Sequence, residues 1–284
     1  MKKICFLALC SIALGLAACN DDKDNPVDGV VPTVGTSGGS VCAVSVYKDG
    51  TENGHDYVDL GLTSGTRWAT ANVGAKTPQD YGDYYAWGET ITKANYSWNT
   101  YIDGNIASES DCGTDKDALK GVTNIAGTQF DAAYVNWGGM WCMPTQTQQD
   151  ELCNQCYWVW TENYNASNVK GFIVYKAKTS SEKGVMAYDE ETVSSSYSLS
   201  DAHIFLPAAG FRSTDDIVIG NFTIHNDAIY GVGSHCYYWS SLMIVDSPYD
   251  AWCINLHSEN VHDVDTYDKF RYFGQSVRAV IPGE

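Results

Sequence analysis

The chain has 284 residues, of which 17 are lysine or arginine and 35 are aspartate or glutamate, giving a formal net charge of −18. A chain this acidic is a poor candidate for nucleic-acid binding, because phosphates are recognised by basic surfaces. Its 9 tryptophans and 19 tyrosines favour contact surfaces, since aromatic rings stack on sugars and anchor protein interfaces.

The amino terminus has the pattern of a bacterial lipoprotein signal peptide. Met1-Lys2-Lys3 is basic, residues 4–14 are apolar, and Leu16-Ala17-Ala18-Cys19 has the small-residue spacing of a cleavage site. We expect removal of residues 1–18 and acylation of Cys19, whose acyl chains would anchor the protein in a membrane. An ordinary secretory signal with an incidental cysteine is the alternative.

Residues 19–40 have the composition of a tether. The acidic run from Asn20 to Asp24 precedes a stretch of Pro, Gly, Ser and Val that cannot bury a core. An acidic patch directly behind a lipidated cysteine resembles the surface-export signal of lipoproteins in the Bacteroidetes phylum. The resemblance implies a lipid-anchored protein of the outer membrane that faces the cell exterior.

Residues 41–284 are expected to form the folded domain. A length of about 240 residues suits one domain with a sizeable core, or two small ones. Neither an internal repeat nor a second linker divides the stretch, so one domain is the preferred interpretation. No other segment is long and apolar enough to span a bilayer.

Short strands dominate the first part of this domain. Residues 41–47 alternate as a strand, and residues 57–62 and 66–74 are predicted to form a hairpin. Residues 91–128 are polar without a sustained period, so we expect a long surface excursion with one helical turn near 117–121.

A helix is predicted to begin at residue 146. Thr145 followed three residues later by Gln148 fits a capping box. Leu152, Cys153 and Cys156 would form an inward stripe on this helix. The Cys-x-x-Cys spacing also occurs in redox and zinc motifs, but no second Cys/His pair at zinc spacing accompanies it, so packing is the preferred interpretation.

Further strands are predicted over residues 170–175 and at the carboxyl end. In the last of these, Val277, Ala279 and Ile281 alternate and would share one face.

Seven of the 10 cysteines lie beyond Cys19. An odd number outside the cytoplasm leaves at least one unpaired thiol or an intermolecular bond. We expect most to fill the core, with one or two disulfides whose pairing stays open. Cys236 and Cys253 flank an apparent hairpin over residues 237–255 and are one candidate pair.

An ordered series of short motifs runs through the domain: Tyr57-Val58-Asp59-Leu60-Gly61-Leu62, Trp68-Ala69-Thr70, Tyr81-Gly82-Asp83-Tyr84-Tyr85-Ala86-Trp87-Gly88-Glu89, Val135-Asn136-Trp137-Gly138-Gly139, Met143-Pro144-Thr145, Phe205-Leu206-Pro207-Ala208-Ala209-Gly210-Phe211-Arg212, Tyr238-Trp239-Ser240-Ser241 and Ser276-Val277-Arg278. The series resembles the Fibrobacter succinogenes major paralogous domain and covers nearly everything from Tyr57 onward. The resemblance implies a C-type lectin-like fold, an α+β domain with small twisted antiparallel sheets, two flanking helices and long loops. Where the family usually carries arginine in its Trp-Arg-Met-Pro-Thr segment, this chain has Cys142, so any ion pair of that arginine is missing.

The polar, aromatic segment 242–273 lies between two framework-like ends, and we predict that it forms a displayed binding surface. Trp68, Trp87, Trp137 and Trp239 are assigned to the framework instead. The candidate ligand-binding residues are Asp246, Tyr249, Asp250, Trp252, His257, Glu259, His262, Asp263, Tyr267, Phe270 and Tyr272.

Metal binding and catalysis are not expected. Histidines and carboxylates between residues 257 and 265 could hold an ion, but the tripeptide of calcium-dependent sugar-binding lectins is absent, so a solvated acidic loop is preferred. No Gly-x-Ser-x-Gly elbow and no distinguishable carboxylate pair indicates a hydrolase. We therefore expect no catalytic residue, no metal and no cofactor.

The leading hypothesis is a cell-surface lipoprotein whose domain binds an extracellular glycan or surface protein without chemistry. One alternative is a variable protein of a diversity-generating retroelement, with ligand contacts diversified near the carboxyl terminus. Another is a structural or adhesin-tip component of a surface assembly.

Overall fold

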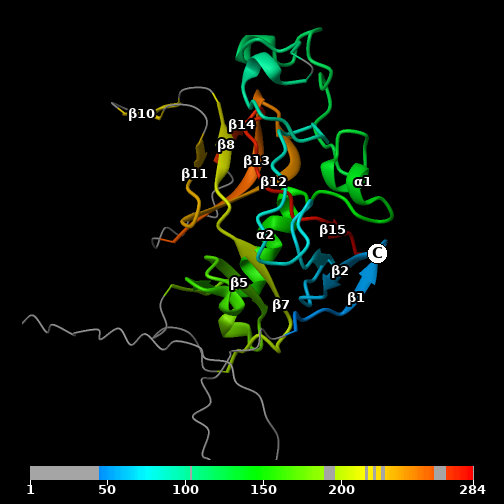
Figure 1. Cartoon of the computed structure of the whole chain (residues 1–284). Coiled ribbons are helices and arrows are strands. Elements are labelled where there is room, and N and C mark those ends of the chain that lie inside the picture. The colour runs from blue at the N-terminus through cyan, green and yellow to red at the C-terminus, as the bar shows by residue number, and fades with distance from the viewer. Residues whose placement is uncertain are drawn as a thin grey trace, which may run out of the picture. The chain divides into compact units, whose positions relative to one another are not determined.

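The computed structural model describes residues 45–102, 104–188, 196–214, 217–219, 222–224, 228–258 and 267–283. All of them belong to one compact unit, Val41–Glu284. Within them, two α-helices, α1 (Ala132–Trp137) and α2 (Gln146–Gln155), accompany short strands in small, mostly antiparallel sheets (Figure 1). The predicted α+β class is therefore confirmed.

The first and last described strands share one antiparallel sheet, in the order β1 (Gly50–Glu52), β2 (His55–Val58), β3 (Arg67–Ala69) and β15 (Val280–Ile281). The predicted hairpin is confirmed, with Val58 of β2 opposite Trp68 of β3. The strand predicted over residues 41–47 is wrong in its described part, because residues 45–47 lie outside any strand.

A tight turn closes the hairpin of β1 and β2. Its two residues, Asn53 and Gly54, have φ of +44° and +85°. Asn-Gly is the favoured pair for a two-residue hairpin turn that needs positive φ at both positions.

The second sheet follows α2 directly and has the order β6-β4-β5-β7. Its strands are β4 (Cys156–Thr161), β5 (Gly171–Lys176), β6 (Met186–Ala187) and β7 (His203–Pro207). The helix begins as predicted: the Thr145 hydroxyl accepts a hydrogen bond from the Gln148 N–H, and the Gln148 side chain accepts one from the Thr145 N–H at 2.8 Å.

A long hairpin forms the third sheet, in which β12 (His235–Ile244) pairs with β13 (Ser247–His257) and β14 (Tyr267–Phe270) pairs with β13. Helix α2 packs against β12 and β13 (Figure 1). Gln149 in this helix donates from Nε2 to the carbonyls of Tyr238 and Trp239, at 3.0 and 3.1 Å. The hairpin is therefore fixed to the helix by backbone contacts as well as by packing.

The remaining elements are short. Two-stranded sheets pair β8 (Phe211–Ser213) with β11 (Ala228–Tyr230), and β9 (Ile217–Ile219) with β10 (Phe222–Ile224). Single 3-10 turns are η1 (Trp98–Thr100), η2 (Glu109–Asp111), η3 (Tyr164–Ala166) and η4 (Ser180–Glu182). The helical turn predicted near 117–121 is wrong, because these residues form hydrogen-bonded turns only.

The carboxyl-terminal segment lies between two hydrophobic clusters, although only Val280–Ile281 of the expected strand is paired, as β15. Val277, Ala279 and Ile281 belong to one cluster, and Val280 belongs to the other. The predicted alternation is thus confirmed. The four framework tryptophans are also buried as predicted, at 0 to 8% exposure.

Arg278, two residues before β15, is buried at 1% exposure. Its Nε donates to Asn72 Oδ1 at 2.8 Å, and its terminal nitrogens donate to the carbonyls of Ala69, Thr70 and Phe205 at 2.7 to 3.0 Å. Buried donors of an arginine must be satisfied, and here carbonyl and amide oxygens satisfy them. One side chain thereby joins β3, β7 and the segment that leads into β15.

Arg271, which follows β14, is buried with a carboxylate instead. Its Nη2 lies 2.7 Å from Asp117 Oδ2, and the two side chains are 0% and 1% exposed. The guanidinium also lies over the rings of Trp87 and Tyr101. Because Asp117 belongs to the excursion, the pair connects it to the long hairpin's sheet.

The stretch 91–128 is more than the surface excursion that its polarity predicts. Tyr96, Tyr101, Ile106, Leu119 and Ile125 are each 0% exposed. The polar residues between them make local turns, so the apolar ones can reach the core.

No helix among the described residues is both long and apolar enough to cross a membrane.

Candidate ligand-binding site

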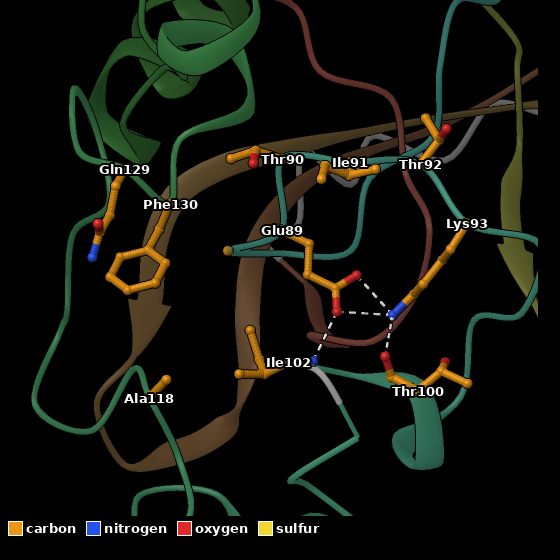
Figure 2. A pocket seen from close by; sticks show the side chains of 11 residues that line it. Glu89, Thr90, Ile91, Thr92, Lys93, Thr100, Ile102, Ala118, Gln129 and Phe130 are labelled. Carbon is orange, nitrogen blue, oxygen red and sulfur yellow. Dashed lines mark hydrogen bonds and ion pairs between the residues drawn. The ribbon is translucent and has the colours of Figure 1, made fainter.

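A hollow of about 540 Å³ opens between four segments in and beside the excursion (Figure 2). Its lining residues are Gly88, Glu89, Thr90, Ile91, Thr92, Lys93, Thr100, Ile102, Ala118, Gln129 and Phe130. Ligand pockets in proteins commonly have volumes of roughly 300–1,000 Å³. The hollow therefore has room for a small ligand or for one end of a larger one.

Gly88 sets the path of the first loop where it leaves the buried Trp87. Its φ is +83°, and a Cβ at this position would lie 2.5 Å from Cδ1 of Leu119. Only glycine combines this backbone conformation with so close an approach. The chain can thus turn outward and form one side of the hollow.

An ion pair within the first loop is hydrogen-bonded to the second loop. Lys93 Nζ lies 2.7 Å from Glu89 Oε2, and the side chains are 18% and 15% exposed. Lys93 also donates to the Thr100 carbonyl at 3.0 Å, while Glu89 accepts from the Ile102 N–H at 2.7 Å (Figure 2). Both charges are therefore satisfied within the wall.

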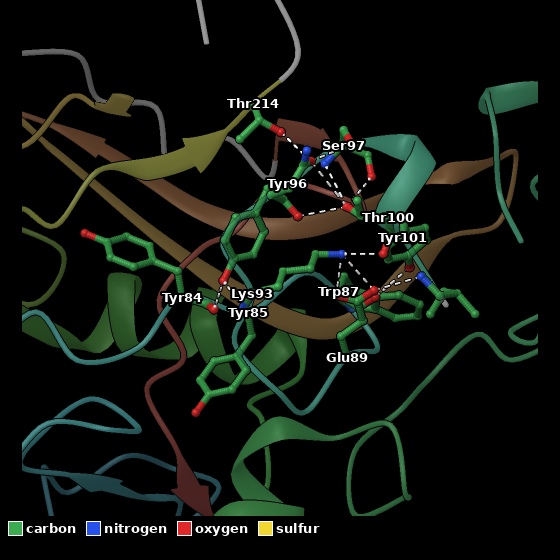
Figure 3. Close-up of polar contacts among 12 residues, drawn as sticks. Tyr84, Tyr85, Trp87, Glu89, Lys93, Tyr96, Ser97, Thr100, Tyr101 and Thr214 are labelled. Carbon is green, nitrogen blue, oxygen red and sulfur yellow. Dashed lines mark hydrogen bonds and ion pairs between the residues drawn. The ribbon is translucent and has the colours of Figure 1, made fainter. Parts of the chain in front are cut away.

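Two buried tyrosine rings lie beside the Lys93 ammonium of this ion pair. Lys93 Nζ lies 5.6 Å from the ring centroids of both Tyr96 and Tyr101. The Tyr101 hydroxyl donates to the Trp87 carbonyl at 2.6 Å, and the Tyr96 hydroxyl donates to the Tyr84 carbonyl (Figure 3). Burial raises the pKa of Tyr101 well above its ordinary value, so this phenol stays a neutral donor.

The lining combines apolar contact with neutral hydrogen-bonding groups. Ile91, Ile102 and Phe130 supply apolar surface, and Ile91 is 78% exposed. Threonine hydroxyls and the exposed amide of Gln129 lie beside them. Since Glu89 and Lys93 neutralise each other, the lining carries no net charge.

The predicted binding residues of the terminal segment are only partly exposed. Asp250 and Tyr272 are both 4% exposed, so the prediction that they form part of a displayed surface is wrong. Tyr249 and Phe270 are half-buried against the core, with ring centroids 6.1 Å apart. Aromatic residues in this segment serve packing first.

Three other described candidates retain some exposure. Asp246 is exposed at the tip of the hairpin, and Trp252 and His257 are half-buried on β13. Only the backbone of Tyr267 is described, in β14 opposite Cys253. Cys19, Glu259, His262 and Asp263 lie outside the described residues, as does the tether over 19–40.

The hollow was not predicted from the sequence, because its lining comes from separate polar loops. One local signal was present: Gly88-Glu89 follows an aromatic run, and Lys93 stands four residues after Glu89. That spacing permits an ion pair, but it does not reveal a partner loop.

The described cysteines are buried. Cys153 and Cys156 belong to one hydrophobic cluster, which confirms the packing interpretation of their spacing. Cys236 belongs to the same cluster but Cys253 to the other, and the register sets them opposite Leu256 and Trp239, so the predicted pair is wrong. Cys42 lies outside the described residues.

The buried thiols are also unsuited to nucleophilic chemistry. Burial raises the pKa of Cys142 and of Cys156 to about 12. A thiol must ionise to act as a nucleophile, so these cysteines stay protonated and inert near neutral pH.

A second apolar feature lies on α1 and the turn after it. Tyr134, Val135 and Met140 are 42%, 50% and 53% exposed. Tyr134 and Met140 also line a shallow hollow of about 300 Å³ with Trp141 and Pro282. We call these three exposed residues the α1 patch.

No protein-family model, curated protein or solved structure matches this chain.

Proposed function

We propose that this protein is a lipoprotein of the outer cell surface, anchored through Cys19, whose domain binds an external ligand without catalysing a reaction. The amino-terminal lipoprotein pattern and the acidic tether support the location. The motif series that resembles the Fibrobacter succinogenes major paralogous domain supports a C-type lectin-like arrangement of the observed small sheets and two helices.

The hollow over Glu89 and Phe130 is the observation that carries the binding proposal. Its loops are fixed by the Glu89–Lys93 pair and by buried tyrosines, so little ordering is needed when a ligand binds. A pre-formed cavity with apolar walls and a few polar groups is the usual form of a ligand site.

The chemistry of the lining favours a glycan over a charged metabolite. A sugar presents an apolar ring face and many neutral hydroxyls, which fit Phe130 and Ile91 on one hand and threonines and Gln129 on the other. A charged ligand would find no unpaired opposite charge, because Glu89 and Lys93 already satisfy each other.

A glycan-array screen of the full-length protein tests this proposal. We expect binding that Phe130→Ala and Ile91→Asn abolish, since both remove apolar contact from the hollow. Val185→Asn is the matched control, because Val185 is also exposed, at 40%, but does not line the hollow. Retained binding in both hollow variants, with loss in Trp252→Ala, would move the site to the terminal hairpin.

A role as a structural or adhesin-tip component of a surface assembly is the second candidate. The α1 patch favours it, because contiguous exposed apolar residues often mark protein interfaces. Copurification of one partner in fixed stoichiometry, lost in Met140→Asp but kept in Phe130→Ala, would support this role over glycan binding.

A further inference from the structure

Two histidines face each other across the long hairpin. His235 begins β12, His257 ends β13, and the strand register sets them directly opposite. Side chains at such positions project from the same face, with Cβ atoms roughly 5 Å apart. The imidazole centroids are 4.1 Å apart, and the ring planes are inclined by 58°. Both rings are therefore within reach of one small ion.

The neighbours of His235 set the orientation of its ring. Tyr237 stacks on it almost in parallel, with centroids 5.7 Å apart and planes 5° apart. Gly231 has φ of +72°, and a Cβ there would lie 2.9 Å from Cβ, Cγ and Nδ1 of His235. The glycine leaves the space that the imidazole occupies, so the ring is positioned before any ligand arrives.

The hydrogen bonds of Ser234 are linked to the tautomer of His235. The Ser234 hydroxyl donates to the Gly231 carbonyl at 3.2 Å and lies 2.8 Å from His235 Nδ1. A hydroxyl has one proton to donate. When the hydroxyl donates to Gly231 it accepts from the imidazole, and this tautomer carries the proton on Nδ1 and leaves the lone pair on Nε2 for a ligand. Metal-binding histidines are oriented in this way by a bond from their other nitrogen.

We propose that His235 and His257 chelate one divalent transition-metal ion of the Cu²⁺, Ni²⁺ and Zn²⁺ class. Imidazole nitrogen suits these ions, whereas Ca²⁺ and Mg²⁺ require oxygen ligands. Nitrogens bind a tetrahedral ion at roughly 2.0–2.1 Å, so the ring centroids move apart by about 1 Å on binding. Both side chains are half-buried at the hairpin's open end.

The described part of the chain supplies two ligands to this ion, His235 and His257. Among the described residues, no group of three or more His, Cys, Asp or Glu side chains could hold a metal ion.

The positive charge of Lys269 lies near the site and should repel a bound cation. Its Nζ lies 5.7 Å from the centroid of Tyr237, the ring that stacks on His235. A positive charge this near raises the free energy of a divalent cation. Removing the charge with Lys269→Met should tighten metal binding without touching either ligand.

Calorimetric titration of the full-length protein in detergent, without a polyhistidine tag, tests the site with NiCl₂, CuCl₂, ZnCl₂ and CaCl₂. We expect one ion per chain, with Cu²⁺ bound more tightly than Ni²⁺ or Zn²⁺ and no effect of Ca²⁺ on this site. His235→Gln and His257→Gln should abolish binding of the transition-metal ion, and Ser234→Ala should weaken it about tenfold. His55→Gln is the control and should leave binding unchanged, because the His55 ring stacks on Trp137.

Electron paramagnetic resonance of the wild-type protein with one equivalent of Cu²⁺ keeps the test independent of the folding of the variants. Coupling to two imidazole nitrogens is the expected spectrum. Coupling to only one, or equal Ni²⁺ affinity in wild type and His235→Gln, would overturn the proposal. Weaker binding in Lys269→Met would also contradict the placement of the ion.

Discussion

The excursion over residues 91–128 and the terminal hairpin of β12 and β13 reverse the roles that their compositions suggest. The excursion is polar, yet it buries Tyr96 and Tyr101 and builds the hollow. The hairpin is rich in aromatic residues and polar groups, yet most of it packs into the two core clusters. The average polarity of a segment therefore does not predict whether its side chains are exposed, because buried side chains also depend on where the segment's polar groups find hydrogen-bond partners.

The largest expected effect comes from removing the buried ion pair between Asp117 in the excursion and Arg271, which follows β14 in the sheet of the hairpin. Arg271→Ala leaves Asp117 buried and unpaired, which we expect to lower the free energy of unfolding by about 3–5 kcal/mol. Chemical denaturation would measure it. Asp115→Asn is the control, because the Lys120–Asp115 pair is exposed and should contribute nothing measurable. A loss below 1 kcal/mol in Arg271→Ala would show that the pair does not connect the regions energetically.

A second substitution changes a residue that lines the hollow and leaves the hairpin residues unchanged. Glu89→Gln removes the partner of Lys93 and weakens the bond from the Ile102 N–H, so we expect a loss of about 1–3 kcal/mol in unfolding free energy. Glycan binding should fall further than stability, because the loops that form the hollow are no longer held together. Unchanged binding in a folded Glu89→Gln protein would exclude the hollow as the site.

Acid should act on the framework through His203. It is 2% exposed, hydrogen-bonded to the Tyr164 hydroxyl at 3.0 Å, and burial lowers its pKa from the ordinary 6.5. Below pH 6.5 the unfolded chain takes up a proton there that the folded protein resists, so stability falls as the pH falls, by at most about 1.4 kcal/mol per pH unit.

Unfolding free energies at pH 7.5, 6.5 and 5.5 check this prediction. His203→Gln should be less stable than wild type at every pH but should show a shallower decline below pH 6.5. Parallel curves for the two proteins would assign the acid sensitivity to other groups.

The smallest expected effect concerns the helix behind the hairpin. Thr145→Ala removes the hydroxyl that caps α2, and we expect a loss of about 1 kcal/mol. Thr145→Ser keeps the cap and should restore most of it. Thermal unfolding of the two variants side by side gives the comparison, and equal melting temperatures would mean that Gln148 alone suffices.

The sequence predicted local features well and long-range ones poorly. The capping box at Thr145, the hairpin of β2 and β3 and the alternation at Val277 to Ile281 depend on neighbouring residues, and the structure confirms all three. The hollow depends on contacts between residues 88–93, 100–102, 118 and 129–130, whose proximity no local pattern encodes.

The burial of Asp250 and Tyr272 shows the same limit. An aspartate and a tyrosine in a mixed segment suggest a surface, yet both are 4% exposed in the folded chain. Their positions follow from the pairing of β13 with β12 and β14, and from contacts of Tyr272 with rings such as Trp98, far away in sequence.

The pairing of β15 with β3 also constrains how the chain matures. Arg278 reaches the carbonyl of Ala69 across 209 positions, so the first sheet cannot be completed until Val280 and Ile281 have emerged from the ribosome. Contacts this distant in sequence form slowly, because a long loop must close before they contribute. A chain built in this way is therefore still incompletely folded when residue 281 is synthesised, although β1, β2 and β3 were made more than 200 residues earlier.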